Sequence, residues 1–195
     1  MLSGAFIGAV MSILAGLMQA TPDATGTAIA RPLGKAEFFS ASDSYFQVFE
    51  FFGKPPHTWA HANRMVRGYR VEGRDGRLAH VPDLETHFFL LSHFQLMNQQ
   101  RMWIGLYVDC GERITTHWVE GPALDAQPFR AWIDTAPGTI RGLCRTHRSS
   151  GRPVPVFYEP SEFGVRWQAM APGGNLKYMM VEFPAPDGQS EQSVD

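Results

Sequence analysis

Met102-Trp103-Ile104-Gly105-Leu106-Tyr107 is an unbroken apolar run near the middle of a chain of 195 residues. Short apolar runs of this kind are typical of strands that are buried on both faces of a sheet. The run therefore predicts a central, buried strand, and the rest of the domain is predicted outward from it.

A second strand is predicted before this run, at the start of the predicted domain. Residues 45–52 are aromatic and β-prone, and Gly53-Lys54-Pro55-Pro56 ends them with a turn. Residues 67–77 are rich in Gly and Arg and predict a loop.

Two helices are predicted between the first strand and the central run. Thr58 can cap a helix over residues 59–66, whose apolar side chains recur at helical spacing. Asp83 can cap a second helix over residues 84–94. The residues of the second helix that we expect to face the core are Leu84, Phe88, Leu91 and Phe94.

Beyond the central run the chain is predicted to consist of strands and loops. The β-prone segments are residues 116–118, 154–158, 165–170 and 177–183. Residues 122–153 show little periodicity, and unstructured loops longer than about 15 residues in a compact domain are usually functional or disordered. We therefore expect a long loop region here.

Composition limits the classes of function. Apolar residues make up 44% of the chain, enough for a full core, while charged residues make up 18% and the net charge is −2. No global positive field would attract nucleic acid, so no nucleic-acid partner is expected.

The first residues resemble an export signal. Residues 1–20 are apolar and free of charge, which predicts either a signal peptide or, if it is not cleaved, an N-terminal membrane anchor. Residues 21–43 are predicted to be a linker, residues 44–184 the domain, and residues 185–195 a disordered tail. The expected location is secreted, cell-surface or periplasmic, and membrane contact is expected only if residues 1–20 remain.

Eight short motifs follow one another along the chain in a characteristic order. They are Thr58-Trp59-Ala60-His61-Ala62, Leu78-Ala79-His80-Val81, Glu85 with Phe88-Phe89, Trp103-Ile104-Gly105-Leu106, Trp118-Val119-Glu120-Gly121, Phe129-Arg130-Ala131-Trp132, Gly164-Val165-Arg166-Trp167 and Tyr178-Met179-Met180-Val181-Glu182. In this order they resemble the C-type lectin-like domain family. The resemblance implies an α+β fold with two helices flanking small antiparallel sheets and a long loop region.

The chain departs from the family at its disulfides. The positions that match the family's bridge between the first helix and the last strand are Val66 and Val181, so we expect apolar packing between them instead. Cys110 and Cys144 lie outside the family positions, and either a disulfide between them or two separate thiols fits the sequence.

The chain also departs from the family's calcium-dependent sugar site. The matching loop is Ala136-Pro137-Gly138-Thr139-Ile140-Arg141, and the matching pair after Trp167 is Gln168-Ala169. Calcium needs six to eight oxygen ligands, roughly, mostly carboxylates and amides. We therefore predict no metal site and no cofactor, with a calcium-dependent lectin as the alternative.

The long loop is rich in cations. Arginine side chains bind sulfate, carboxylate and phosphate groups in a bidentate way. The alternative is an ordinary solvated loop. The predicted ligand-binding residues are Arg141, Arg145, His147, Arg148 and Arg152, with Trp167 and Gln168 beside them.

No nucleophile with an adjacent base is recognisable, so the protein is predicted not to be an enzyme. The predicted function is that of an exported protein that binds a glycan or an extracellular protein, with an anionic ligand favoured. The alternatives are a calcium-dependent lectin and a surface module for self-association.

Overall fold

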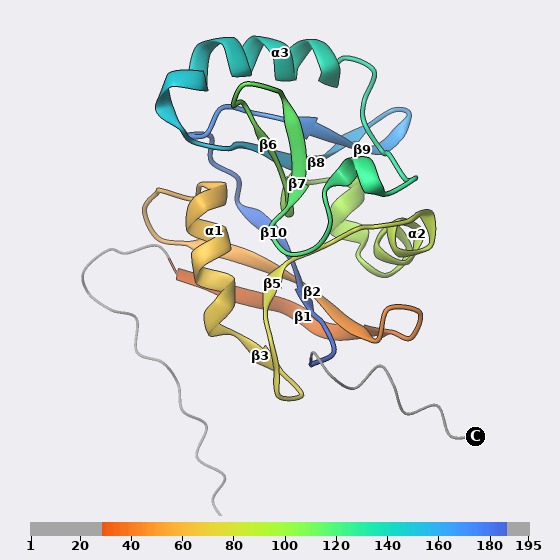
Figure 1. Cartoon of the computed structure of the whole chain (residues 1–195). Helices are drawn as coiled ribbons and strands as arrows, with labels where there is room; N and C mark the ends of the chain where they lie inside the picture. The colour runs from red at the N-terminus through yellow and green to blue at the C-terminus, as the bar shows by residue number, and fades with distance from the viewer. Residues whose placement is uncertain (1–28, 187–195) are drawn as a thin grey trace, which may run out of the picture.

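One mixed sheet runs through the domain and separates its first two helices (Figure 1). The computed structural model describes residues 29–186. The strands are β1 (Ile29–Phe39), β2 (Ser44–Phe52), β3 (Arg70–Val71), β4 (Arg74–Asp75), β5 (Arg77–Leu78), β6 (Met102–Asp109), β7 (Thr115–Trp118), β8 (Val154–Ser161), β9 (Gly164–Ala169) and β10 (Tyr178–Phe183). The helices are α1 (Trp59–Met65), α2 (Leu84–His93) and α3 (Ala136–His147).

The closing strand β10 joins the two halves of the sheet. The strand order is β1-β2-β10-β6-β8-β9, with β5 also paired to β10 and β7 to β6. The pairing of β10 with β6 is parallel, and the other pairings in this sheet are antiparallel. The α+β class is confirmed, and the central run is the strand β6, bordered on both sides as predicted.

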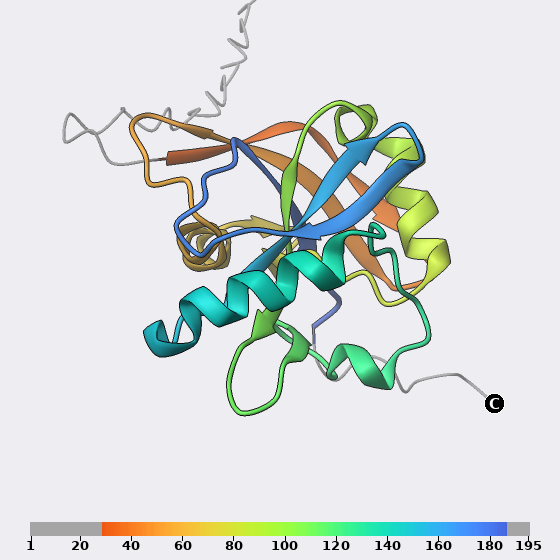
Figure 2. The same ribbon diagram turned by 90° about the horizontal axis from the view of Figure 1, so that it is seen from above.

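The side chains of β6 alternate between the two faces of the sheet and so belong to two separate core clusters. Met102 and Ile104 belong to the cluster on the α2 side, which we call the α2 core, while Trp103 belongs to the cluster on the α1 side, the α1 core. Successive side chains of a strand point to opposite faces, so a strand buried on both faces is apolar throughout. Figures 1 and 2 show α1 and α2 on opposite sides of the sheet.

Helix α1 begins and packs as the sequence predicts. The Thr58 side chain accepts a hydrogen bond from the His61 backbone N–H at 3.3 Å. Trp59 donates its indole N–H to the Ile104 carbonyl at 2.7 Å, which attaches the helix to the central strand. Val66 and Val181 are both fully buried in the α1 core, where the predicted packing requires them.

The predicted orientation of α2 is wrong. Asp83 caps the helix as expected, accepting from the Thr86 N–H at 2.7 Å, but Leu84 and Phe88 are 51% and 59% exposed. Leu91 is half-buried, and the buried residues are Thr86, His87 and Leu90. Apolar side chains occur on almost every side of the helix, so its periodicity does not select a face. The hydrogen bond between the side chains of His87 and Tyr158 helps to set the orientation.

The predicted linker is wrong for residues 29–39, which form β1. This strand pairs with β2 along its length, although most of its side chains are exposed. An edge strand pairs with one neighbouring strand, and its other side is exposed to solvent, so its sequence needs few apolar residues. The predicted signal peptide and most of the predicted tail lie outside residues 29–186.

Candidate anion-binding surface on helix α3

A twelve-residue helix, α3, occupies the centre of the segment for which we expected a loop. Ala136 and Cys144 are buried and Ile140 and Leu143 half-buried, so these side chains form one face, packed on β8 and β9. Gly138 and Gly142 weaken the intrinsic helix propensity by up to about 1 kcal/mol each. The helix therefore depends on its contacts with the sheet. The predicted binding residues thus lie largely on and just after a helix, and not in the loop that we expected.

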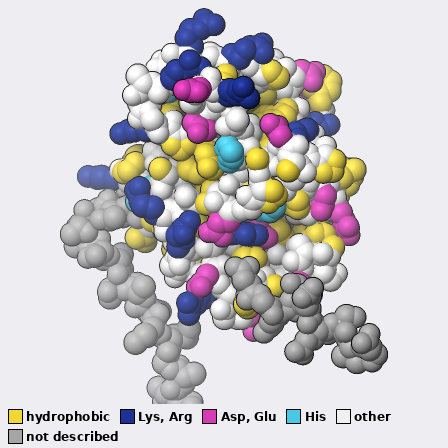
Figure 3. Space-filling model, in the orientation of Figure 1, with side chains coloured by type: hydrophobic (Ala, Val, Ile, Leu, Met, Phe, Trp, Pro, Cys, Tyr) yellow, Lys and Arg dark blue, Asp and Glu magenta, His cyan; other side chains and the backbone are white. Residues whose placement is uncertain are grey.

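Three of the predicted arginines lie along one side of this helix. Arg141, Arg145 and Arg148 are spaced by four and three residues, which places them on a common face. All three are exposed, and Arg148 follows directly after the last residue of α3. We call these three residues the α3 stripe; Figure 3 shows dark-blue side chains at this end of the molecule.

The charges of the stripe are uncompensated within residues 29–186. None of the three arginines has a carboxylate within 4.0 Å there. Arg148 donates its Nε–H to the Cys110 carbonyl at 3.2 Å, which positions its guanidinium. Like charges one helical turn apart destabilise a helix by about 0.2–0.5 kcal/mol per pair. A polyanion on this surface would remove that repulsion.

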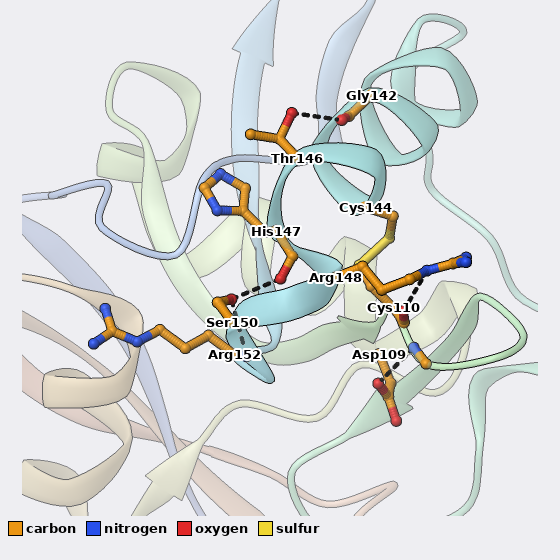
Figure 4. Close-up of a disulfide and its surroundings, with 10 residues drawn as sticks. Asp109, Cys110, Gly142, Cys144, Thr146, His147, Arg148, Ser150 and Arg152 are labelled. Carbon is orange, nitrogen blue, oxygen red and sulfur yellow. Dashed lines mark hydrogen bonds between the residues drawn. A yellow bond between two sulfur atoms is a disulfide. The ribbon is translucent and has the colours of Figure 1, made fainter.

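A disulfide fixes the stripe to the sheet. Cys110, just after β6, is bonded to Cys144 of α3, with 5.1 Å between their Cα atoms (Figure 4). The bond closes a loop of 34 residues, and both sulfur-bearing side chains are buried. The arginine face of α3 therefore has a defined direction relative to the central strand.

His147 and Arg152 do not join the stripe. Figure 4 shows Arg148 directed to Cys110, while His147 and Arg152 extend to the opposite side of the helix end. Gly151, which has a φ of 60°, ends this helical segment and turns the chain before Arg152. The predicted cluster of four arginines and one histidine is therefore split.

Trp167 cannot contact a ligand, and its predicted role is wrong. Its side chain is fully buried, and its ring lies edge-on to the rings of Trp118, Phe129 and Trp132 at centroid distances of 5.4–5.7 Å. Period-two alternation in β9 turns Val165, Trp167 and Ala169 inward together.

Gln168 supports the helix rather than extending the stripe. Its side-chain amide donates to the Thr135 hydroxyl at 3.2 Å, at the start of α3. The amide therefore has a structural partner on the neighbouring element, and the stripe lies further along the helix.

Arg113 is a further cation near the stripe, and it was not among the predicted ligand-binding residues. It is exposed, lies three residues after Cys110, and has no acidic partner among the described residues. Because Cys110 is bonded to Cys144, the loop that carries Arg113 is held close to α3. Its adjacent Glu112 offsets part of this charge.

The residues at the family's calcium positions do not fit calcium. Residues 136–141 are the first half of α3 and supply no carboxylate, while Gln168 is bonded to Thr135. Within residues 29–186, no group of three His, Cys, Asp or Glu side chains is arranged to hold a metal ion. Independence from calcium stays a prediction.

The most deeply buried carboxylate is fully bonded within the protein. Glu182 of β10 accepts hydrogen bonds from Arg77 at 3.1 Å through two nitrogens, from the Ser44 hydroxyl at 3.0 Å and from the His80 N–H at 2.9 Å. These four donors satisfy both carboxylate oxygens. It anchors β10 to β5 and to the start of β2.

Burial keeps two histidines neutral. Desolvation, with a smaller effect from the charge of Arg166, lowers the pKa of His87 to about 4. Desolvation also lowers the pKa of His80. Neither ring adds positive charge at neutral pH.

No family model matches the chain, and no curated protein matches it. No helix in the described part of the chain is long and apolar enough to cross a membrane. The solved structures that resemble it include EMS16, an antagonist of the collagen receptor integrin alpha2beta1, with 17% identity over 76% of this chain and 96% of the other and a TM-score of 0.45. They also include rhodocetin, with 17% identity over 73% and 91% of the two chains and a TM-score of 0.40. Likenesses at this level assign neither a ligand nor an activity to this chain.

Proposed function

We propose that this protein is a non-catalytic, exported binding protein whose α3 stripe recognises a linear polyanionic glycan, without calcium. The observation that carries the proposal is a row of three exposed arginines with no acidic partner in residues 29–186, on a helix pinned by a disulfide. Helical rise spaces the Cα atoms by about 6 Å and then about 4.5 Å along the axis. A row of this kind suits a ligand that carries sulfate or carboxylate groups at regular intervals.

The disulfide supports the predicted export. Stable disulfides form and persist mainly in oxidising compartments such as the periplasm and the extracellular space. Cys110 and Cys144 are the chain's only cysteines, so this bond uses both. The secreted, cell-surface or periplasmic location stays part of the proposal.

The test is binding to immobilised heparin, used as a sulfated probe. We expect R141Q/R145Q/R148Q to weaken binding by about tenfold or more, because three charge-assisted contacts are lost. The matched control is R67Q/R70Q/R101Q, which removes the same charge from exposed arginines that are already paired with Glu120, Asp75 and Glu159. The control should change the Kd by less than about threefold, since partly screened charges act weakly at a distance.

Three outcomes would overturn the proposal. Equal weakening by both triple variants would show that net charge, and not the stripe, attracts the probe. Binding to neutral glycans that disappears with a chelator would favour the calcium-dependent alternative. Binding to an acidic protein surface, without binding to heparin, would replace the glycan by a protein partner.

A second candidate function, self-association, is favoured by the outer face of α2. Leu84 and Phe88 lie one turn apart, are more than half exposed, and continue into the half-buried Leu91. Contiguous exposed apolar side chains often mark an interface. A dimer seen by light scattering that L84S/F88S converts to a monomer would support this function, and a monomeric wild type at high concentration would reject it.

A further inference from the structure

A pocket of about 390 Å³ opens beside α1, on the side of the molecule to which Arg152 extends. Its walls come from the start of α1, from the start of β8 and from the turn between β9 and β10. Its volume is in the range of pockets that hold small molecules, about 300–1,000 Å³.

The interior of this pocket is apolar and rigid. Four prolines line it together with Trp59, and proline offers no backbone N–H donor; they are Pro56, Pro153, Pro155 and Pro172. The indole N–H of Trp59 is donated to the Ile104 carbonyl at 2.7 Å, so Trp59 offers only carbon atoms to an occupant. Thr58 also lines the pocket, and its hydroxyl oxygen already accepts a hydrogen bond from the His61 backbone N–H. These mostly apolar walls favour a flat hydrocarbon body.

Two arginines from distant parts of the chain stand at the rim. Arg64 comes from α1 and Arg152 from the segment after α3, and both are exposed. Figure 4 shows the Arg152 side chain extended away from the disulfide, toward the ribbon that has the colour of α1.

The rim charges are uncompensated, unlike those of other hollows. No acidic residue lines this pocket, and neither Arg64 nor Arg152 has an ion pair in the described part of the chain. In the hollow lined by Ser42 and Thr86, by contrast, Arg77 is paired with Glu182. An apolar interior with free guanidinium groups at its mouth is complementary to an apolar anion.

We infer that this pocket is a second, separate binding site, for a small molecule with an apolar body and one carboxylate. The body lies against the four prolines and Trp59, and Arg64 and Arg152 bind the carboxylate. Arginine forks match carboxylate geometry, and their charge strengthens the hydrogen bonds. The site does not depend on the α3 stripe or on its proposed glycan.

The test is a titration of the full chain with 3-phenylpropionate, followed by NMR of ¹⁵N-labelled protein. We expect saturable shifts of the backbone amide signals of Trp59, Ala60 and Gly173, which are residues that line the pocket. The neutral analogue 3-phenyl-1-propanol should bind about tenfold more weakly or worse, and acetate, which lacks the body, should not saturate. Equal binding of acid and alcohol would overturn the assignment of the arginines.

The variants R64Q and R152Q should each weaken binding of 3-phenylpropionate by about fivefold or more and leave binding of the alcohol unchanged. R145Q is the matched control, because Arg145 is equally exposed and unpaired but lies on the stripe. It should leave the titration unchanged, while R152Q should leave heparin binding unchanged. Shifts confined to other surfaces, or R64Q and R152Q behaving like wild type, would overturn the inference without affecting the proposed function.

Discussion

At the residue scale, the close approach of a neighbouring backbone segment explains why position 105 in the central run is a glycine. A Cβ atom there would lie 2.6 Å from the Leu78 carbonyl oxygen and 3.1 Å from that of Ala79. The Gly105 N–H donates to the Ala79 carbonyl at 2.9 Å, and its own carbonyl accepts from Val119 at 2.8 Å. The glycine lets a second backbone segment approach β6 closely enough for these bonds.

Gly105→Ala should therefore lower the free energy of unfolding by about 1–3 kcal/mol, the usual cost of overpacking a core. The measurement is urea denaturation monitored by tryptophan fluorescence. Gly142→Ala is the control: nothing lies within 4 Å of its added Cβ, and α3 gains helix propensity, so stability should rise by up to about 1 kcal/mol. A Gly105→Ala protein as stable as wild type would contradict the close approach.

His87 makes stability depend on pH. The ring is 2% exposed, its Nδ1 lies 2.9 Å from the Tyr158 hydroxyl oxygen, and burial lowers its pKa from 6.5 to about 4. Between these values the unfolded chain binds a proton that the folded chain does not, so stability is present above pH 6.5 and is lost as the pH falls toward 4. The lowered pKa of His80 acts in the same direction.

Between pH 7.5 and pH 4.5 we expect His87 alone to contribute a loss of about 2–3 kcal/mol. The measurement is the free energy of unfolding of wild type and His87→Gln at both pH values. The variant should be less stable at pH 7.5 but lose less on acidification. An identical pH dependence in the two proteins would show that His87 is not kept neutral by burial.

At the scale of elements, periodic apolar patterns predicted β2, α1 and β6 well because packing decides those segments. Three failures have physical reasons. The edge strand β1 needs few apolar side chains, α2 is apolar on most sides, and α3 contains two glycines and a stripe of arginines. In each case a tertiary contact, and not the local pattern, determines the structure.

The candidate site was predictable only in part for the same reason. The arginines were visible as a cluster in sequence, but the turn at Gly151 separates Arg152 from the stripe. Arg64 could not be linked to Arg152 from the sequence, because 88 positions separate residues that meet at one pocket. Trp167 was misplaced although Val165, Trp167 and Ala169 alternate with the polar Arg166 and Gln168, a pattern that indicates a buried face for the tryptophan.

The disulfide should stabilise the domain through α3. Removing it in C110A/C144A should cost about 2–4 kcal/mol of unfolding free energy, as for loops of similar length. Reducing agent should destabilise the wild type by a similar amount and leave the variant unchanged, which can be measured by thermal unfolding. A wild type that is indifferent to reductant would indicate that the bond contributes nothing to α3.

At the scale of the whole molecule, charge is distributed unevenly although the net charge is only −2. Most arginines on the sheet side are paired with acids, while those of the α3 stripe and the rim of the pocket have no acidic partner in residues 29–186. The fold thus presents two separate unpaired cationic surfaces, one open and one at a hollow. The open surface is suited to a polyanion and the hollow to a small apolar acid.

The most direct test of the central claim is the salt dependence of heparin binding. If the stripe binds through its charges, log Kd should rise steeply with log salt for wild type, and the slope for R141Q/R145Q/R148Q should be smaller by roughly two. The variant R67Q/R70Q/R101Q should keep the wild-type slope. Equal slopes for wild type and the stripe variant would contradict the account, because they would mean that the α3 arginines make no ionic contact with the probe.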